Sequence, residues 1–344
     1  MNKKLLYFNL AVDEKDTSLG FAIDWIKHIS NEFNHVDVVS LRVDSIPEFD
    51  NSVNIYGLKS STNKISKYLF FLKKVKKLVK ENNYDRCFSH MSPISVVLSY
   101  LYLKKSGIKT TLWFTHPGPR FGIKKLILYL SFLISEQVVT ASNTSFPFKG
   151  KKVNVIGHAI NFEKFRKSKT HYSFENFLML SRISKSKNLE VGIDSFLNSK
   201  FKSFSLDIIG GPLNEKDEKY LKSLKKKYKT KNVNFLGKID HKDLPEIISK
   251  YDVNINCAKR GFYDKSVLET LSMGIINFYR NDDFNSLFLE NQKFYFENID
   301  ELTKKLNSLD ELNHNHILAI FNEIELKLQE NSLSTLSKRL LSYL

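Results

Sequence analysis

Glycine and cysteine are scarce in this sequence, and each scarcity excludes a class of site. Only 13 of the 344 residues are glycine, well below the usual ~7%, and neither G-x-G-x-x-G nor G-x-x-x-x-G-K-[ST] occurs. We therefore expect neither a nicotinamide-binding Rossmann site nor a P-loop NTPase. Cys87 and Cys257 are the two cysteines, 170 positions apart. This spacing predicts neither a disulfide framework nor a zinc cluster, and it indicates a reducing compartment.

Other motifs of catalysis and metal binding are also missing. The absence of G-x-S-x-G weakens a serine-hydrolase interpretation, and no H-E-x-x-H or other metal-site spacing occurs among the histidines. His314 and His316 stand in a polar stretch that we expect to be a linker. Since no D-x-D occurs, no metal site for holding a diphosphate is predicted. A bound diphosphate would be neutralised by Arg, Lys, backbone N–H groups and helix N-termini.

No hydrophobic run is long enough to span a bilayer. The longest uncharged window, Cys87–Leu103, contains His90, Pro93 and four serines, which does not fit a transmembrane helix. The N-terminal apolar run is short, is interrupted by Asn9 and ends in acidic residues. We therefore expect Leu5–Ala11 to be a first β-strand and not part of a signal peptide.

The charge of the chain is strongly unbalanced. Lys and Arg number 53 against 37 Asp and Glu, a formal net charge of +16. Such an excess attracts anions: nucleotides, phosphorylated sugars, anionic lipid or nucleic acid. Hydrophobic residues make up 42% and charged residues 26%, which is the balance of a globular protein of about two domains.

Short apolar runs alternate with amphipathic stretches along the chain, which is typical of βαβ units and parallel sheets. The sequence predicts an α/β fold of two doubly wound Rossmann-like domains facing across a cleft, with ligands at the carboxyl ends of the strands. The domains are expected at residues 1–168 and 169–330, with the polar segment Arg166–Tyr172 as linker. The last strand is expected at Lys293–Phe296, and Ser332–Leu344 is expected to form an amphipathic helix.

Two cations follow the first strand of the second half. Phe177–Leu180 reads as a strand, and Arg182 and Lys187 come after it, where a helix begins near Asn188. Two cations beside free backbone N–H groups suit a diphosphate. A solvated basic loop is the alternative explanation of the same residues.

Two further segments carry candidate binding residues. Gly210 and Gly211 follow the strand Leu206–Ile209, and paired glycines let a backbone approach a ligand closely, although a plain βα turn explains them too. A helix is expected from Ser266 to Met273, with Gly274 as a C-cap. Glu269 on this helix could accept hydrogen bonds from a vicinal diol such as a ribose; alternatively, it only offsets the helix dipole.

In this order and spacing, the segments from Asn176 to Gly274 resemble the C-terminal half of retaining glycosyltransferases of the GT-B fold, of the group 1, family 4 type. The resemblance implies that Arg182 and Lys187 clasp the donor diphosphate and that Glu269 binds the ribose. The family's first acid, which contacts the donor sugar, is replaced here by Gly261, and Asp264 or Lys265 would substitute for it. The implied donor-binding residues are Gly210, Gly211, Asp264, Lys265, Ser266, Val267 and Glu269.

The first half resembles the family in fewer places. The turn Ser18–Phe21, with Gly20, stands where the family has a glycine loop near the acceptor. His116, after the strand Thr110–Phe114, resembles the histidine that the family delivers to the donor sugar, and His90 is a second candidate on the acceptor side. Each histidine could equally be a loop or core residue. The resemblance also implies that the terminal helix, residues 331–344, packs back on the first domain.

The resemblance implies an enzyme of the hexosyltransferase type that moves a sugar from a nucleotide-diphosphate sugar to an acceptor hydroxyl, with retention and without a cofactor. The implied setting is polysaccharide or lipid-linked glycan synthesis. A GT-B-like sugar-nucleotide epimerase and a non-catalytic sugar-nucleotide binder are the alternatives. Nucleic acid is not an expected partner, because no nucleic-acid motif occurs.

A lysine-rich stretch bears on where such an enzyme works. Lysines crowd Lys64–Lys80 between apolar residues, and a basic amphipathic helix can lie on an anionic membrane surface. This would suit a lipid-linked acceptor and a cytoplasmic protein bound peripherally to the inner face of the membrane. A helix with a solvated lysine face is the alternative.

Overall fold

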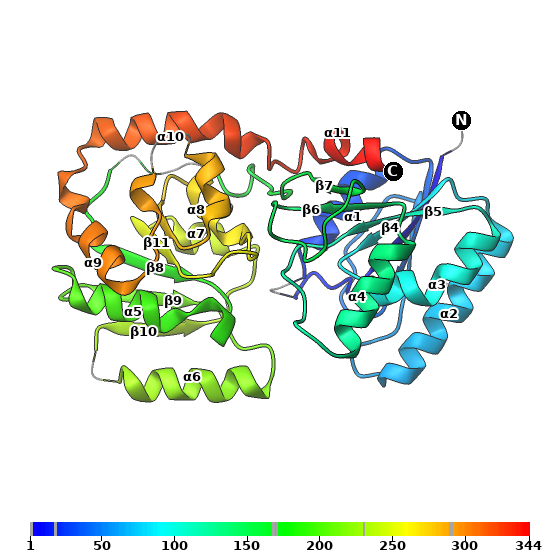
Figure 1. The fold of residues 1–344 in the computed structure, drawn as a ribbon, viewed down its shortest axis with the longest axis horizontal. Coiled ribbons are helices and arrows are strands. Elements are labelled where there is room, and N and C mark those ends of the chain that lie inside the picture. The colour runs from blue at the N-terminus through cyan, green and yellow to red at the C-terminus, as the bar shows by residue number, and fades with distance from the viewer. Residues whose placement is uncertain (1–2, 17–18, 167–168, 170, 230, 289–291) are drawn as a thin grey trace. The chain divides into compact units, whose positions relative to one another are not determined.

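The structure is a computed structural model that describes residues 3–16, 19–166, 169, 171–229, 231–288 and 292–344. The chain forms two compact units, one of residues 1–159 with 332–344 and the other of residues 160–331 (Figure 1). The sequence placed these divisions at 168/169 and 330/331. Of the expected linker, residues 167, 168 and 170 lie outside the described residues, as does Ser18 of the predicted glycine turn.

Unit 1 is built on a seven-stranded parallel sheet in the order β3-β2-β1-β4-β5-β6-β7. Leu5, Leu6 and Phe8 of β1 are all fully buried, the continuous apolar pattern of a parallel strand covered on both faces. Its strands are β1 (Lys4–Asn9), β2 (His35–Ser40), β3 (Val53–Tyr56), β4 (Arg86–His90), β5 (Lys109–Trp113), β6 (Gln137–Thr140) and β7 (Val153–Val155). Its helices are α1 (Ala22–Ser30), α2 (Lys64–Glu81), α3 (Pro93–Lys105), α4 (Ile123–Ile134) and α11 (Leu336–Leu340).

The helices of unit 1 divide between the two faces of its sheet. Helix α3 packs against both α2 and α4, and α1 packs against α11. Right-handed crossovers place α2, α3 and α4 on one face of the sheet and α1 on the other. The expected terminal helix is shorter than predicted, because only Leu336–Leu340 is α-helical and a 3₁₀ turn follows. Arg339 of this helix donates to the carbonyl oxygens of Ile156 and His158, which fixes the segment within unit 1.

Unit 2 is built on a five-stranded parallel sheet in the order β10-β9-β8-β11-β12. Its strands are β8 (Asn176–Leu180), β9 (Ser205–Ile209), β10 (Val233–Gly237), β11 (Val253–Asn256) and β12 (Ile276–Tyr279). Its helices are α5 (Leu189–Asn198), α6 (Glu215–Lys227), α7 (Leu244–Ile248), α8 (Lys265–Ser272), α9 (Ile299–Asn307) and α10 (His314–Gln329). Neither β7 in unit 1 nor α9 was predicted.

Two sequence predictions for unit 2 are wrong. The strand expected at Lys293–Phe296 is a 3₁₀ turn followed by a single bridge between Tyr295 and Tyr279. Phe294 and Phe296 are buried, so the apolar alternation that suggested a strand reflects packing on β12. The stretch with His314 and His316 is the first turn of α10 and not a linker, since the Asn313 side chain accepts from the His316 amide and caps the helix.

None of the helices in the described part of the chain is long and apolar enough to cross a bilayer.

Candidate functional site

The order of strands in unit 2 reverses between β8 and β11. The chain runs outward from β8 through β9 to β10, then returns to the other side of β8 with β11 and β12. Strands β8 and β11 are paired in parallel, with Phe177 opposite Val253. The loops that leave their carboxyl ends therefore diverge, and ligands of doubly wound sheets bind at such a switch point.

A buried ion pair joins these two loops. Lys187, from the loop after β8, places Nζ 2.5 Å from Oδ1 of Asp264, which follows β11. Asn256 donates its Nδ2 to Oδ2 of Asp264 at 3.0 Å, and the Lys187 ammonium lies 5.0 Å from the centre of the Phe262 ring. Lys187 is only 4% exposed. It is therefore not part of a solvated basic loop, the alternative that the sequence left open.

Electrostatics within this pair follow from its burial. Burial lowers the pKa of Lys187, and the nearby Asp264 only partly offsets that effect. Burial would raise the pKa of Asp264, but the charge and hydrogen bond of Lys187 and the bond from Asn256 hold it below its usual value. The pair stays ionised because each charge has a partner. Lys187 itself lies in the 3₁₀ turn Lys185–Lys187, and α5 begins one residue later than predicted because Asn188 is left-handed, with φ 48°.

Arg182 lies near the Lys187–Asp264 ion pair, and none of the described residues binds its side chain. It follows β8, is partly buried, and makes no side-chain hydrogen bond or ion pair with any residue that the structure describes. Its positive charge contributes to lowering the pKa of both Lys187 and Asp264. A planar guanidinium offers several parallel N–H donors, which suits a phosphate or carboxylate.

Glu269 lies on α8, whose first residue follows Asp264. Glu269 is 5% exposed, and its Oε1 lies 3.3 Å from Nε2 of His241 and 3.5 Å from Nζ of Lys265. Burial would raise the pKa of Glu269, but the Lys265 charge and the His241 hydrogen bond lower it from 4.5 to about 2. Glu269 is therefore an anion at neutral pH, and it does more than offset the dipole of its helix.

The sequence did not single out His241. It follows β10 at the same edge of the sheet, and its ring lies 5.3 Å from the ring of Phe165. Its position after a strand was the only available signal, because the contact with Glu269 joins a loop to helix α8, 28 positions further along the chain. His241 and Lys265 both contact Oε1 and together hold the carboxylate in place.

Three predicted donor-binding positions are explained by packing within the unit. Gly210 has φ +139°, and a Cβ there would lie 1.9 Å from the carbonyl oxygen of Ser181. A Cβ on Gly211 would collide with the Lys238 side chain. The Val267 side chain is fully buried, and its amide donates to the Asp264 carbonyl. These contacts need no ligand, so the predicted roles of Gly210, Gly211 and Val267 in binding stay predictions.

At Gly261, where the resemblance placed the family's first acid, the backbone is left-handed, with φ +92°. The Asp264 carboxylate, offered as a substitute, is already bound to Lys187 and Asn256. Lys265 and Ser266 open the first turn of α8, and the amides of these two residues have no partner within the helix. Predicted residues Arg182, Lys187, Asp264, Lys265, Ser266 and Glu269 thus gather at one edge of the unit 2 sheet.

The predicted residues of unit 1 also gather at the carboxyl edge of their own sheet. Its strand order reverses between β1 and β4, whose last residues, Asn9 and His90, are paired. His90 is 1% exposed, its Nδ1 lies 3.3 Å from Oδ1 of Asn9, and the Trp25 ring is 4.7 Å away. Gly20 lies in the loop after β1, and His116, partly buried, follows β5. His90 is thus packed in the core, and of the two histidines only His116 reaches the surface.

Residues 161–321 match the family described as glycosyl transferases group 1, and this stretch covers nearly all of unit 2. Unit 2 belongs to the group 1 glycosyltransferases. Its site at the β8–β11 switch point lies within the matched region. No curated protein sequence matches the chain significantly.

Solved structures similar to this glycosyltransferase share the GT-B fold along the whole chain. HepE from Anabaena, in complex with UDP and glucose, has a TM-score of 0.75 at 14% identity, with 99% of this chain and 98% of that chain covered. S. aureus TarM, in a complex with UDP, has a TM-score of 0.73 at 10% identity, with 99% of both chains covered. The lipopolysaccharide outer core galactosyltransferase WaaB has a TM-score of 0.68 at 14% identity, with 99% of this chain and 100% of that chain covered.

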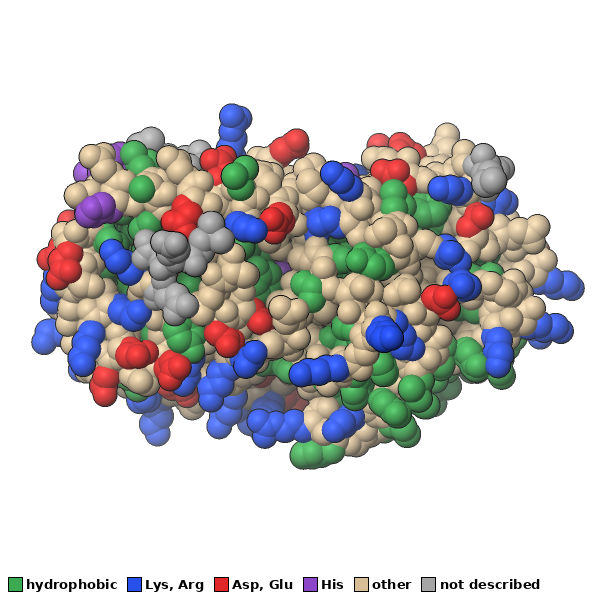
Figure 2. Space-filling view, turned by 45° about the horizontal axis from the view of Figure 1, so that its top comes forward, with side chains coloured by type: hydrophobic (Ala, Val, Ile, Leu, Met, Phe, Trp, Pro, Cys, Tyr) green, Lys and Arg blue, Asp and Glu red, His purple; other side chains and the backbone are tan. Residues whose placement is uncertain are grey.

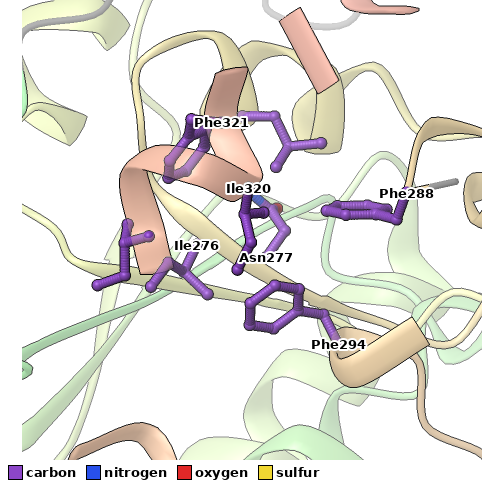
Figure 3. A pocket seen from close by; sticks show the side chains of 8 residues that line it. Ile276, Asn277, Phe288, Phe294, Ile320 and Phe321 are labelled. Carbon is purple, nitrogen blue, oxygen red and sulfur yellow. The ribbon is translucent and has the colours of Figure 1, made fainter. Parts of the chain in front are cut away.

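The small apolar cavity behind α8 in this glycosyltransferase is no substrate site. It has a volume of about 10 Å³ and lies between β12 and α10, where Ile276, Phe294 and Phe321 face one another (Figure 3). Such a volume holds at most one water molecule. The cavity is a packing defect of the core, and the switch-point residues remain the candidate site.

Proposed function

We propose that this glycosyltransferase moves a hexose from a nucleotide-diphosphate sugar to an acceptor hydroxyl with retention of configuration, and that unit 2 holds the donor. One observation carries the proposal: Arg182, Lys187 and Lys265 bring three cations to the switch point of the sheet, beside the carboxylate of Glu269. A nucleoside diphosphate presents matching groups, namely two phosphates and a ribose diol.

The cations would act on the leaving diphosphate. As the glycosidic bond to the donor breaks, negative charge grows on the phosphate oxygens, and groups fixed in advance stabilise it most effectively. Arg182 is available for this, since no described residue engages its guanidinium. Lys187 is held in place by Asp264, so it contributes a positioned charge. The first amides of α8 add the positive end of a helix.

In this proposal Glu269 recognises the ribose. The contacts with His241 and Lys265 both fall on Oε1, which leaves Oε2 to accept from a ribose hydroxyl. Because the pKa of Glu269 is about 2, the carboxylate stays a pure acceptor at neutral pH. His116 is the proposed counterpart from unit 1 at the donor sugar, and Gly20 and His90 remain acceptor-side proposals.

In this proposal the acceptor is a glycan or a lipid-linked saccharide. The enzyme then takes part in cell-surface polysaccharide synthesis and works on the cytoplasmic side of a membrane. WaaB, a galactosyltransferase of the lipopolysaccharide outer core by name, supports this class at the level of fold. The net charge of +16 supports an anionic setting.

A thermal-shift screen tests the donor assignment. A ligand that binds only the folded chain raises its melting temperature, so one family of nucleotide-diphosphate sugars should raise it while the matching free sugars do not. Slow hydrolysis of the same donor would then show an enzyme and not a non-catalytic binder. A screen in which no nucleotide sugar shifts the melting temperature would contradict the proposal.

A further inference from the structure

Helix α4 carries an uncovered apolar ridge. Ile123, Leu126, Tyr129 and Leu133 are 44 to 68% exposed, and Phe121, just before the helix, is 82% exposed. Their spacing of three or four residues aligns the four helical side chains along one stripe. The opposite side of α4 is also apolar and packs into the core through Leu128. An apolar stripe on the side of a helix that faces away from the core is normally covered by another surface.

The neighbouring helices extend the ridge into a surface. Helix α3 packs between α4 and α2, and it exposes Leu101, while α2 exposes Ile65 and Leu69. We call the outer side of these three helices the α2–α4 face. Figure 2 shows hydrophobic side chains gathered at the lower right of the view, with Lys and Arg side chains around them. Contiguous exposed apolar surface of this kind marks an interaction site.

The charged side chains of the α2–α4 face are almost all positive. Helix α2 contributes seven lysines, and α3 and α4 contribute two each, against a single acid, Glu81. Helix α6 in unit 2 differs, because its six lysines are accompanied by three acids and its apolar residues Tyr220 and Leu224 are buried. Helix α6 thus has many lysines but lacks both the excess of positive charge over acids and the exposed apolar ridge seen in unit 1.

We propose that the α2–α4 face docks on an anionic lipid membrane, with the α4 ridge inserted among the acyl chains and the lysines at the headgroups. Apolar side chains flanked by cations are the pattern of helices that lie in a membrane interface. If this face docked instead on the same face of a second copy of the chain, eleven lysines would oppose eleven others and repel them. Nucleic acid would neutralise the lysines but leave the aliphatic ridge in water.

Docking by this face has a consequence for the reaction. The ridge begins at Phe121, five residues after His116 at the carboxyl edge of the unit 1 sheet. The edge proposed to meet the acceptor thus adjoins the lipid surface, as a lipid-linked acceptor requires. The docking itself does not depend on the donor assignment, because it involves no residue of unit 2.

Vesicle flotation of the full chain tests the proposal. The protein should float with vesicles of phosphatidylcholine mixed with phosphatidylglycerol and stay unbound with phosphatidylcholine alone. Leu126→Gln together with Leu133→Gln should weaken binding at least about tenfold, since each exposed leucine would be buried in lipid. Lys73→Gln with Lys76→Gln and Lys80→Gln should weaken it by a similar factor and reduce its salt dependence.

Matched variants in unit 2 keep the test specific. Leu326 on α10 is 80% exposed, and Leu326→Gln should leave binding unchanged, as should Lys222→Gln with Lys225→Gln on α6. Melting temperatures and the shift caused by nucleotide sugar should stay as in the unmodified chain, which separates docking from donor binding. Equal binding to neutral and anionic vesicles, or normal binding by the ridge variant, would overturn the proposal. A dimer of the unmodified chain that Leu126→Gln dissociates would also overturn it. So would failure of the unmodified chain to bind vesicles, combined with binding to duplex DNA that the ridge variant retains.

Discussion

Glu269 shows how the fold fixes the charge of one side chain. Its carboxylate is almost fully buried, and two neighbours, Lys265 and His241, approach the same oxygen. Burial alone would favour the neutral acid, but these partners outweigh it and bring the pKa to about 2. The consequence is a carboxylate that stays ionised, and so accepts hydrogen bonds, at neutral and mildly acidic pH.

Replacing this carboxylate should change stability in a pH-dependent way. The pKa is 4.5 before folding and about 2 after it, so ionised Glu269 stabilises the fold above pH 4.5, by about 3 kcal/mol, and less as the pH falls toward 2. Glu269→Gln should therefore lower the urea midpoint of unfolding most at pH 7, and the difference from the unmodified chain should shrink below pH 4.5. A difference that stays constant from pH 7 to pH 2.5 would contradict this account.

The ion pair between Lys187 and Asp264 makes a second prediction at this scale. Asp264→Asn leaves a buried ammonium without its counter-charge and should destabilise the chain by about 3 kcal/mol, as measured by urea unfolding. Asp264→Leu combined with Lys187→Met removes both charges and should recover much of that loss, while nucleotide binding stays weak. Recovery of nucleotide binding by the double variant would mean that Lys187 does not serve the donor.

At the scale of elements, the turn between β9 and α6 must pass close to the loop after β8. Gly210 lets the backbone pass against the Ser181 carbonyl oxygen, where a Cβ would lie at 1.9 Å. Gly237 also has a positive φ, of +82°, but a Cβ there meets nothing within 4 Å. A side chain at Gly237 would therefore meet backbone strain alone, whereas one at Gly210 would also meet a steric conflict.

Alanine substitutions at these glycines should differ in cost. Gly237→Ala should cost about 1–2 kcal/mol, the strain of a left-handed backbone, while Gly210→Ala should cost clearly more because the loop after β8 must also shift. Thermal unfolding of the two variants measures this difference. Equal losses would show that the approach of the two loops is not rigid.

Sequence patterns predicted the elements of the sheets better than the contacts of the site. Gln137–Thr140 and Val253–Asn256 were predicted at the bounds that the structure has, because each is a short segment that holds apolar β-branched residues. Lys293–Phe296 is also short and rich in apolar residues, but only Tyr295 pairs with a strand, and α10 was missed because its first turn is polar. The contact of His241 with Glu269 joins residues 28 positions apart, and no local pattern encodes it.

At the scale of the whole molecule, the two units repeat one arrangement. Each sheet reverses its strand order once, between β1 and β4 and between β8 and β11, and the predicted residues of each unit lie at the carboxyl edge of its sheet. Unit 2 carries the family match and the cluster of cations, while unit 1 carries His116 and the α2–α4 face. We infer that donor recognition and membrane docking are assigned to different units.

The most direct test of donor recognition is a titration of nucleoside diphosphate into the unmodified chain and into the Arg182→Ala variant. The account predicts that Arg182→Ala weakens binding about tenfold or more, because a charge-assisted bond to phosphate is lost. Arg260→Ala is the control: its guanidinium pairs outward with Asp282, 3.5 Å away, and its loss should change the affinity less than about twofold. Equal affinities for the unmodified chain and Arg182→Ala would contradict the placement of the diphosphate at the switch point of unit 2.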